Sequence, residues 1–565
     1  MSSKAVTLLI ATMIVLCGVI VYANTLDGEW VWDDASSVLL HKDVQNPASL
    51  LELFKKDQHA FGRGAGNFYR PMVSVTFMAD YALTPKPADT SPSVLARELP
   101  PFYFHLSNMA WHIAAALSLF ALLRLLGAPV WVQAAACLVF VVHPLHTEAV
   151  AYISGRADML SATFLFLGLY CALQDGTAGR RALYWSASAL CFVLGLLSKE
   201  SSLIFPLLLA ALIALRPLPG NVSGIAAKRA YYFPRLAPLA MALGVLVVYA
   251  LLRSSVLQFA TPQESASSAF GTRFVETGQA FWFYMVRLFY PVHLHMEQTL
   301  SGVSGLTALL GYACLGLIAA ALVVSRLMGQ HRVAMGLGWF ILTWLPISGL
   351  FPLNAPMAEH WMYVPMAGFW WAVAEVVYAA VPEGAAAVRN GVVYVFVLLL
   401  MALGAARNQD WHSNERLYEA TLRENPHTTR VRYNLAVTHQ DISGNAAGAR
   451  RNFEALLDVY AQQKAGRGEE GMLLLEEIDV HRSLAHIAMA EDDFATALKH
   501  LMPLVRLPES DQNRPELARD TMDAGKCFLA LGDVTSADQA FGRAAQLVPE
   551  TRMYTLDLLK GAPID

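Results

Sequence analysis

The segment Val303–Val324 reads VSGLTALLGYACLGLIAAALVV and carries no charged side chain over its 22 residues. About 20 consecutive apolar residues allow an α-helix to cross the hydrocarbon core of a bilayer. Ten further apolar runs, some of them shorter, predict spans at Ala5–Ala23, Leu106–Leu123, Val130–Val142, Met159–Leu173, Ala182–Leu197, Leu203–Leu215, Leu236–Leu252, Val333–Leu350, Tyr363–Val377 and Val392–Ala405. We therefore expect an all-α protein, a polytopic membrane bundle of about eleven transmembrane helices.

The composition agrees with a chain that is solvated largely by lipid. Of the 565 residues, 55% are hydrophobic and 15% are charged, whereas soluble domains carry about 25% charged residues. The net charge of −4 gives no indication of nucleic-acid binding. Of the six cysteines, five fall in apolar runs, and their spacing predicts neither disulfides nor a cysteine zinc site. A cleaved signal peptide is the alternative for the first run, which is longer than the usual core of ~7–15 residues.

Lysine and arginine gather in alternate connections between the predicted spans. This set comprises Lys4, Arg124, Arg180, Arg181, Arg216, Lys228, Arg229, Arg235, Arg326, Arg332 and Arg389. The positive-inside rule places these connections and the N-terminus in the cytoplasm, and eleven crossings place the C-terminal region on the outer side. The short aromatic segment Phe281–Tyr290 contains Arg287 and would invert this pattern as a span. We therefore predict that it is interfacial or re-entrant.

The first outer connection, residues 24–105, is too long for a plain loop and contains the glycine-rich string FGRGAGNF at Phe61–Phe68. It is predicted to carry short helices and part of a functional site. Near its start, Glu29–Asp34 reads EWVWDD. An aspartate can act as general base toward a hydroxyl acceptor, and an adjacent carboxylate can raise its pKa or help to hold a metal. Asp33 and Asp34 are thus candidate catalytic residues, with Mn²⁺ or Mg²⁺ as an optional ligand, and solvated loop acids are the alternative.

Other ionisable side chains lie at the ends of predicted spans on the same outer side. They occur in HPLHTEAVAYISGRAD (His143–Asp158), LSKESS (Leu197–Ser202), MAEHWMYVP (Met357–Pro365) and FYRPMVSVTFMADY (Phe68–Tyr81). The candidates are His143, His146, Glu148, Arg156, Asp158, Lys199, Glu200, Glu359, His360, Arg70 and Arg287.

Each of these side chains alone could be a helix cap or a solvated group, and the two histidines with Glu148 could instead bind a metal, although their spacing matches no zinc signature. Arginine suits an anionic oxygen because its planar fork binds two oxygens at once. Together the candidates predict a site for an anionic lipid headgroup, in which Arg156, Lys199, Arg70 and Arg287 bind the phosphate. No phosphate-binding loop, dinucleotide-binding glycine pattern or zinc-hydrolase motif occurs in the sequence.

The chain after residue 406 changes to mixed charge with helical periodicity. A 34-residue pattern is clearest from Ala518 to Thr551, with small, large and closing positions at Gly525, Phe528, Gly532, Ala537, Phe541, Ala544 and Pro549. This spacing is typical of tetratricopeptide repeats. Weaker copies surround Tyr433–Phe453 and Leu484–Leu501, and a half-repeat covers Arg416–Pro426. We predict a transmembrane domain at 1–406 and an α-solenoid at 407–565 that binds a peptide or serves as a packing module.

These strings occur in the same order as in a known family. VWDD, YRPMVSVTFMADY, FHLSNMAWH, HPLHTEAVAYISGRADML, LSKESS and MAEHWMYVP, followed by the repeats, resemble the transmembrane and tetratricopeptide repeat-containing O-mannosyltransferases. The resemblance implies a GT-C fold and mannose transfer from dolichol phosphate to Ser/Thr of secretory-pathway proteins. It implies an acidic base at Asp33 or Asp34, with Asp34 slightly favoured, and phosphate-binding residues such as Arg156 and Lys199.

The chain also departs from the family pattern. It has fewer repeats than the eukaryotic members, His360 where arginine is frequent, and no retention signal at its end. We therefore expect a prokaryotic relative in a cytoplasmic membrane, with the site facing the periplasm, or an ER membrane if the source is eukaryotic. The expected partners are a polyprenyl-phosphate-linked sugar, an acceptor protein in extended form and membrane lipid.

Two other classes of function are consistent with the sequence. A non-catalytic scaffold would use the repeats to recruit a partner and would tolerate changes at Asp33 and Asp34. A lipid-linked glycan ligase or a transporter is the other alternative. A transporter would show internal repeats and charged residues at mid-membrane, and here only His112 lies inside a predicted span as a candidate of that kind.

Overall fold

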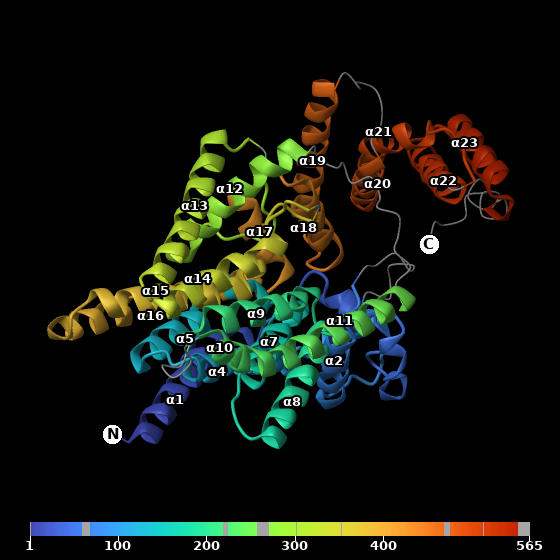
Figure 1. The fold of residues 1–565 in the computed structure, drawn as a ribbon. Coiled ribbons are helices and arrows are strands. Elements are labelled where there is room, and N and C mark those ends of the chain that lie inside the picture. Colours follow the sequence, from blue (N-terminus) through green and yellow to red (C-terminus); the bar gives the residue numbers. More distant parts are fainter. Residues whose placement is uncertain are drawn as a thin grey trace. The chain divides into compact units, whose positions relative to one another are not determined.

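The computed structural model describes residues 2–58, 68–218, 224–256, 270–300, 302–351, 353–467, 475–511 and 513–551. All regular structure within these ranges is helical, which confirms the predicted all-α class (Figure 1). Residues 61–67 of the FGRGAGNF string lie outside the described residues. The chain divides into two compact units, Met1–Ala420 and Thr421–Asp565.

Each of the eleven predicted spans coincides with one helix of the first unit. These helices are α1 (Ser3–Tyr22), α4 (Phe102–Leu125), α5 (Val130–Val142), α7 (Arg156–Ala172), α8 (Ala178–Leu196), α9 (Phe205–Leu215), α11 (Leu236–Val256), α13 (Gly305–Leu327), α14 (His331–Trp344), α15 (Tyr363–Ala380) and α16 (Ala386–Asn408). The connections contain α2 (Pro71–Leu83), α3 (Pro92–Glu98), α6 (Thr147–Ala151), α10 (Gly224–Tyr232) and α12 (Phe270–Phe289).

Five helical segments of the described chain are long and apolar enough to cross a membrane by themselves. They are Ser3–Thr25, Phe102–Leu125, Gly224–Val256, Gly305–Leu327 and Glu383–Trp411. A sixth is possible if α5 and the segment Pro144–Ala151, which meet at a bend of 50°, form one span. The other helices at predicted spans are shorter or less apolar. The chain is thus a membrane protein, and eleven crossings stay a prediction.

The aromatic segment Phe281–Tyr290 belongs to a longer helix than the sequence indicated. Helix α12 begins at Phe270 and runs for 20 residues. It packs on α13, where Gly278 and Gly311 bring the two backbones into direct contact, so that a Cβ on Gly311 would overlap the Gly278 carbonyl. Arg287 is therefore in a packed helix and is nearly buried, with 9% of its surface exposed.

Small residues also permit the close approach of α14 and α15. A Cβ on Gly336 would lie 2.8 Å from the Gly368 carbonyl oxygen, and one on Gly368 would lie 2.7 Å from the Gly336 oxygen. Without side chains at both positions the helices gain extensive van der Waals contact, which is the main source of helix association in lipid. The indole of Trp339 donates a hydrogen bond of 3.1 Å to the Val364 carbonyl across this interface.

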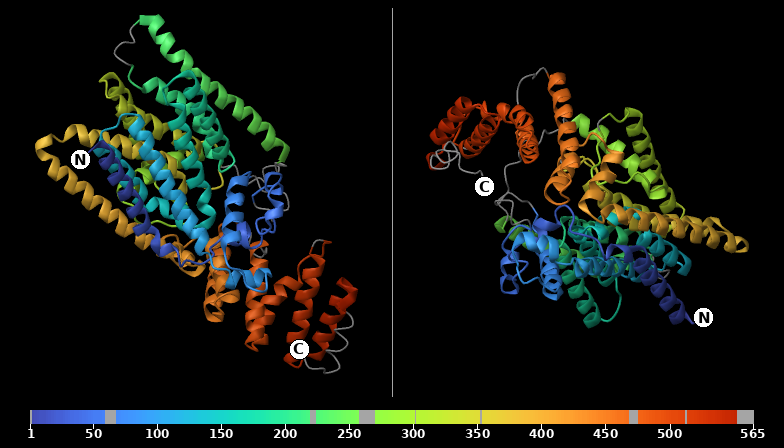
Figure 2. Two further views of the ribbon diagram at one scale, coloured as in Figure 1. Left: turned by 90° about the horizontal axis from the view of Figure 1, so that it is seen from below. Right: turned by 180° about the vertical axis from the view of Figure 1, so that it is seen from behind.

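The beginning and the end of the first unit meet where α1 and α16 pack together, a pairing that Figure 2 shows from below. The Asn408 side-chain amide donates hydrogen bonds to the Val21 carbonyl at 2.8 Å and to Asn24 Oδ1 at 2.9 Å. Asn24 in turn donates to the Ala405 carbonyl at 2.8 Å. Because amides buried in apolar surroundings need partners, these bonds fix the ends of α1 and α16 in register.

The second unit consists of helices that pack on their neighbours in chain order, as in a repeat array. They are α18 (Thr429–Asp441), α19 (Ala446–Arg467), α20 (Leu475–Ala490), α21 (Phe494–Val505), α22 (Arg514–Ala530) and α23 (Val534–Leu547), and α17 (Asn414–Glu424) crosses the unit boundary. The predicted repeat positions pack together: Phe541 is buried, and its ring would lie only 2.6 Å from a Cβ on Gly525.

Substitution of Gly525 by alanine tests this packing. We expect Gly525→Ala to destabilise the second unit by about 1–3 kcal/mol, because the new methyl group forces the buried Phe541 ring to move. Gly542→Ala is the matched control, since a Cβ there has open space around it and alanine favours the helix by ~0.5–1 kcal/mol. Thermal unfolding of the purified full chain should show opposite shifts, and equal shifts would contradict the assigned packing.

Candidate active site

The Asp34 carboxylate is fully buried in the long connection between α1 and α4. Its Oδ1 accepts hydrogen bonds from the backbone N–H and the hydroxyl of Ser154, both at 2.8 Å, and its Oδ2 accepts from the Val31 N–H at 3.1 Å. Burial raises the pKa of Asp34 from 3.8 to about 7, although these hydrogen bonds oppose the shift. Asp34 therefore joins the acidic segment to the connection between α6 and α7.

Asp33 is exposed, in contrast to its neighbour. The chain turns at Trp32, which has a positive φ of 49°, and the Trp32 N–H donates to Asn414 Oδ1 at 2.8 Å. The Asp33 carbonyl accepts from Ser37 N–H at 2.9 Å and from the Ser36 hydroxyl at 2.8 Å, which starts the short helix Ala35–Leu39. The two adjacent acids thus differ in their surroundings, since Asp34 is buried and Asp33 is exposed.

Aromatic side chains surround this turn. The ring of Tyr152 stacks on Trp32 at 6.0 Å between centroids and lies 5.5 Å from Trp411. Burial raises the pKa of Tyr152 well above 10, and the carboxylates of Asp33, Asp34 and Glu148 raise it further. Three of the predicted acids, which come from two different connections, therefore lie within electrostatic range of one phenol.

Glu148 connects this region to the segment before α15. It is buried, and it accepts a hydrogen bond from the His360 N–H at 2.9 Å and contacts His360 Nδ1 at 2.8 Å. With Nδ1 directed at Glu148, the other ring nitrogen of His360 remains for a ligand, and 28% of this side chain is exposed. A histidine oriented by a buried carboxylate is suited to proton transfer or to binding an anion.

Glu359, the neighbour of His360, faces Arg407 at the end of α16. Both carboxylate oxygens lie 3.4 Å from Arg407 Nη2, and Arg407 Nη1 donates to Asp410 at 2.9 Å. Burial raises the pKa of Glu359 against the opposing field of Arg407. Arg407 was not among the predicted site residues, because it follows directly on the apolar run that ends at Ala405. The signal that could have identified it is a basic residue in the string RNQDW, directly after that run.

Arg287 reaches the same region from α12. Its Nη2 donates to Gln298 Oε1 at 2.8 Å, and its charge acts on Glu359. The guanidinium also lies 3.8 Å from the Met357 sulfur and 5.7 Å from the centre of the Phe283 ring. Arg287 and Arg407 thus supply two positive charges to the surroundings of Glu359.

Arg156 has an internal role. It is fully buried and forms an ion pair of 2.5 Å with Asp80 on α2. Its other donors bind the Asn108 side chain at 2.6 Å, the Thr76 hydroxyl at 3.2 Å and the Phe104 carbonyl at 2.8 Å. A lipid phosphate could reach this guanidinium only by displacing these partners. The predicted contact between Arg156 and a phosphate therefore has no support in the geometry.

Lys199 and Arg70 are each paired with an acid but keep part of their surface exposed. Lys199 Nζ lies 2.6 and 2.7 Å from the two oxygens of Asp158, with 13% of its side chain exposed. Arg70 Nε and Nη2 donate to one oxygen of Glu200 at 3.0 and 2.8 Å, with 16% exposed. Both pairs leave nitrogen donors that a second anion can share.

His143 and His146 have other partners, and within the described residues they do not form a group with Glu148 that could hold a metal ion. His143 Nε2 lies 3.0 Å from the Leu288 carbonyl, and its Nδ1 accepts from the Leu145 N–H at 3.3 Å. His146 is fully buried against the Tyr363 ring at 4.3 Å and the His112 ring at 5.3 Å. His112 in turn contacts the Tyr363 hydroxyl at 2.6 Å, which explains this histidine inside a predicted span.

Comparison with known proteins finds relatives that match most of the chain. Human protein O-mannosyl-transferase TMTC3 is 24% identical over 616 residues, which cover 96% of this chain and 64% of the relative. Mouse protein O-mannosyl-transferase TMTC3 is 25% identical over 615 residues with the same coverage. Caenorhabditis elegans protein O-mannosyl-transferase F38B6.6 is 24% identical over 458 residues, or 78% of this chain and 61% of the relative.

The chain is a homologue of the TMTC protein O-mannosyl-transferases. The resemblance inferred from the motifs is therefore confirmed. The chain spans somewhat less than two thirds of the length of these curated TMTC relatives, 64% for the human protein. No family model matches the sequence, and no solved structure matches the chain.

Stability measurements distinguish the two acids. Asp34→Asn removes the acceptor for the Val31 N–H, so we expect a loss of about 1–3 kcal/mol, whereas Asp33→Asn at an exposed position should change stability by no more than about 0.5 kcal/mol. Since the pKa of Asp34 is raised when folded, its contribution to wild-type stability is present at low pH and lost as pH rises through about 7. The penalty of Asp34→Asn should therefore shrink from pH 5 to pH 8 in thermal unfolding, and a growing penalty would contradict the burial.

A double-mutant comparison tests the internal role of Arg156. Arg156→Gln leaves Asp80 buried without its ion-pair partner and should cost about 3–5 kcal/mol. Adding Asp80→Asn removes the uncompensated charge and should restore part of the lost thermal stability. If instead Arg156→Gln leaves stability unchanged and only weakens donor binding, Arg156 acts on the phosphate after all.

Proposed function

We propose that this chain is a membrane glycosyltransferase that transfers a sugar from a polyprenyl-phosphate donor to Ser/Thr hydroxyls of an exported protein. The observation that carries the proposal is the exposed acid Asp33, which directly precedes the buried Asp34 in a chain related to protein O-mannosyl-transferases. The names of the relatives support mannose as the sugar. Positive connections on the opposite face support an outer location for the site, in a cytoplasmic or ER membrane.

In the proposed reaction, Asp33 accepts the proton of the acceptor hydroxyl as the oxygen attacks the anomeric carbon. The bond between this carbon and the phosphate oxygen breaks, and polyprenyl phosphate leaves with the bonding electrons. A single displacement of this kind inverts the anomeric configuration. We assign the base to Asp33, because Asp33 is exposed whereas Asp34 is fully buried, and Asp34 becomes the positioning residue.

Hydrogen-bond donors and basic groups stabilise the charge that develops on the leaving phosphate. His360 has the best-supported position, since it contacts Glu148, and the charges of Glu148 and Asp33 both act on Tyr152. Lys199 and Arg70 are proposed as further ligands that share the phosphate with Asp158 and Glu200. Arg287 and Arg407 compensate Glu359 and contribute through their field.

A divalent cation fits the acidic segment poorly. Asp34 is fully buried and already accepts three hydrogen bonds from Ser154 and Val31, so it offers little room for Mn²⁺ or Mg²⁺. The proposed reaction therefore uses no metal ion. The second unit, as a repeat array, would bind the acceptor protein in extended form, because such arrays offer long surfaces for peptides.

Transfer in reconstituted membranes tests the proposal. The donors are a panel of polyprenyl-phosphate hexoses that includes mannose, and the acceptors are exported proteins of the host. We expect wild-type transfer and a loss of about 10²–10⁴-fold in Asp33→Asn, the range that general bases contribute. Asp27→Asn is the matched control, since Asp27 lies in the same connection with 80% of its side chain exposed, and it should retain full activity.

The outcomes separate the competing functions. Full transfer by Asp33→Asn would exclude this residue as the base. Transfer to a lipid-linked glycan with none to protein would favour the ligase. No transfer from any donor, with the second unit still binding exported proteins, would favour the scaffold.

A further inference from the structure

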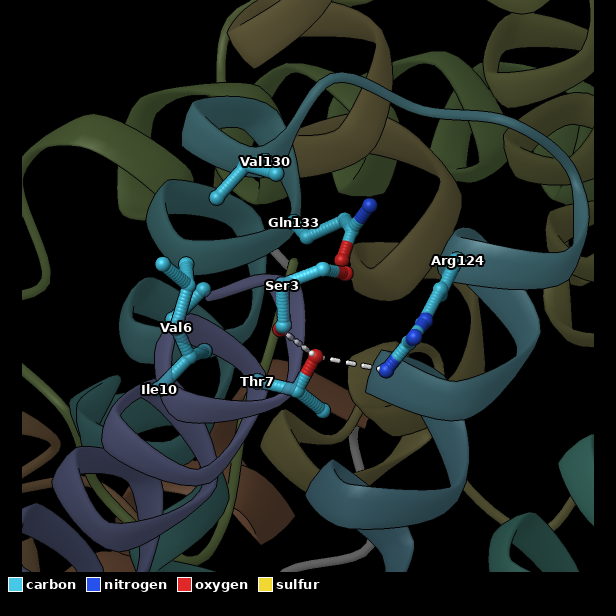
Figure 3. A pocket seen from close by; sticks show the side chains of 7 residues that line it. All are labelled: Ser3, Val6, Thr7, Ile10, Arg124, Val130 and Gln133. Carbon is cyan, nitrogen blue, oxygen red and sulfur yellow. Dashed lines mark hydrogen bonds between the residues drawn. The ribbon is translucent and has the colours of Figure 1, made fainter. Parts of the chain in front are cut away.

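A pocket lies at the end of the first unit opposite to the candidate active site, where α1 begins, α4 ends and α5 begins. Its volume is about 150 Å³, and its polar wall is formed by Ser3, Thr7, Arg124 and Gln133 (Figure 3). The acidic segment follows the other end of α1, and a 20-residue helix is about 30 Å long. The pocket is therefore separate from the site around Asp33.

Arg124 is the charged group of this pocket. It is exposed, and its Nη1 donates a hydrogen bond of 2.6 Å to the Thr7 hydroxyl, which itself donates to the Ser3 carbonyl at 2.9 Å. Figure 3 shows the guanidinium directed at Thr7. Within the described part of the chain, no acidic side chain pairs with Arg124. A guanidinium held in place by one hydroxyl presents its other N–H groups in a fork that suits phosphate oxygens.

Aromatic side chains mark this end of the bundle as the level of the lipid headgroups. Trp131, in the first turn of α5, stacks on Tyr378 at 6.1 Å and donates to Asn390 at 2.8 Å. Arg389 lies over both rings, 4.7 and 5.0 Å from their centres. Tryptophan and tyrosine with neighbouring arginine are typical of the membrane–water interface. Val130, which lines the pocket, directly precedes Trp131, so the pocket lies at the same level of the bundle.

The charge of this face favours an anionic ligand. Its connections, residues 1–4, 124–129, 174–181, 216–235, 325–332 and 378–391, contain eleven Lys or Arg and two Asp or Glu, which gives a net charge of +9 (11 − 2). The remaining wall of the pocket is apolar and consists of Val6, Ile10 and Val130, the last with 52% of its surface exposed. A ligand here needs both an anionic head and a hydrocarbon part.

We propose that this pocket binds the phosphodiester headgroup of an anionic phospholipid. Arg124 binds the phosphate, the hydroxyls of Ser3 and Thr7 contact the glycerol or head oxygens, and one acyl chain lies along Val6, Ile10 and Val130. Lipid bound there joins α1, α4 and α5, and so stabilises the bundle. Basic pockets between helices on the positively charged side of a membrane protein have the chemistry for such lipids.

The test compares the full chain in nanodiscs of phosphatidylcholine with and without phosphatidylglycerol. We expect phosphatidylglycerol to raise the melting temperature of the wild type. In Arg124→Gln most of this increase should disappear, and the affinity for phosphatidylglycerol in native mass spectrometry should fall about fivefold to tenfold. Arg326→Gln is the matched control, because Arg326 is also exposed in the last turn of a helix on this face, and it should keep the increase.

A second variant guards against a folding defect in Arg124→Gln. Thr7→Val retains the arginine but removes the hydroxyl that orients it, and it should weaken phosphatidylglycerol binding in the same direction. Equal losses in Arg124→Gln and Arg326→Gln would show that only general surface charge acts, and the proposal would fall. Equal stabilisation by soluble glycerol 3-phosphate would also overturn it, because the ligand would then need no acyl chain.

Discussion

The buried carboxylate of Asp34 is the interaction on which the candidate site of the first unit depends. A carboxyl group without water is costly unless donors surround it, and here three donors from Val31 and Ser154 do so. These bonds tie the long first connection to the segment between α6 and α7. They also set the turn at Trp32, which directs the next carboxylate outward. The hydrogen bonds that offset the cost of burying Asp34 therefore also fix the backbone on which Asp33 is exposed.

Hydrogen bonds to residues that follow α16 also hold the acidic segment Glu29–Asp34 in place. The Glu29 N–H donates to the His412 carbonyl at 2.8 Å, and the Trp32 N–H donates to Asn414. Residues beyond the last apolar helix therefore belong to the membrane unit, since they complete the hydrogen bonds of the acidic segment. This explains why the first compact unit extends to Ala420, although the change in composition lies near residue 406. Residues from both ends of the unit bind the segment that carries Asp33, so a change in the packing of α16 on α1 would alter the position of this acid.

Local sequence was sufficient to predict most of the helices and much less of the site. Apolar runs predicted a helix at each of eleven positions, because in lipid the backbone groups of each segment must form their hydrogen bonds within that segment. The roles of Asp33 and Asp34 could not be separated, since they depend on Ser154, 120 residues away. The family resemblance slightly favoured Asp34 as the base, whereas the burial of Asp34 favours Asp33 for this role. The internal role of Arg156 could not be predicted either, because its partner Asp80 is on a different helix. A charged residue near a membrane is more readily interpreted as part of a functional site than as part of an internal ion pair.

The pairing of basic with acidic residues has a consequence for a lipid-phosphate donor. A lone arginine or lysine in a poorly hydrated site would bind a phosphate tightly and would retain it after the reaction, since opposite charges attract strongly where the dielectric constant is low. Lys199 and Arg70 each carry a carboxylate partner that neutralises much of their field. In the proposed reaction, a phosphate that shares these cations with Asp158 and Glu200 is bound less tightly than it would be by the cations alone. Ion pairs of this kind balance the charge of the site when no donor is bound, and in the proposed reaction they would permit polyprenyl phosphate to leave after sugar transfer.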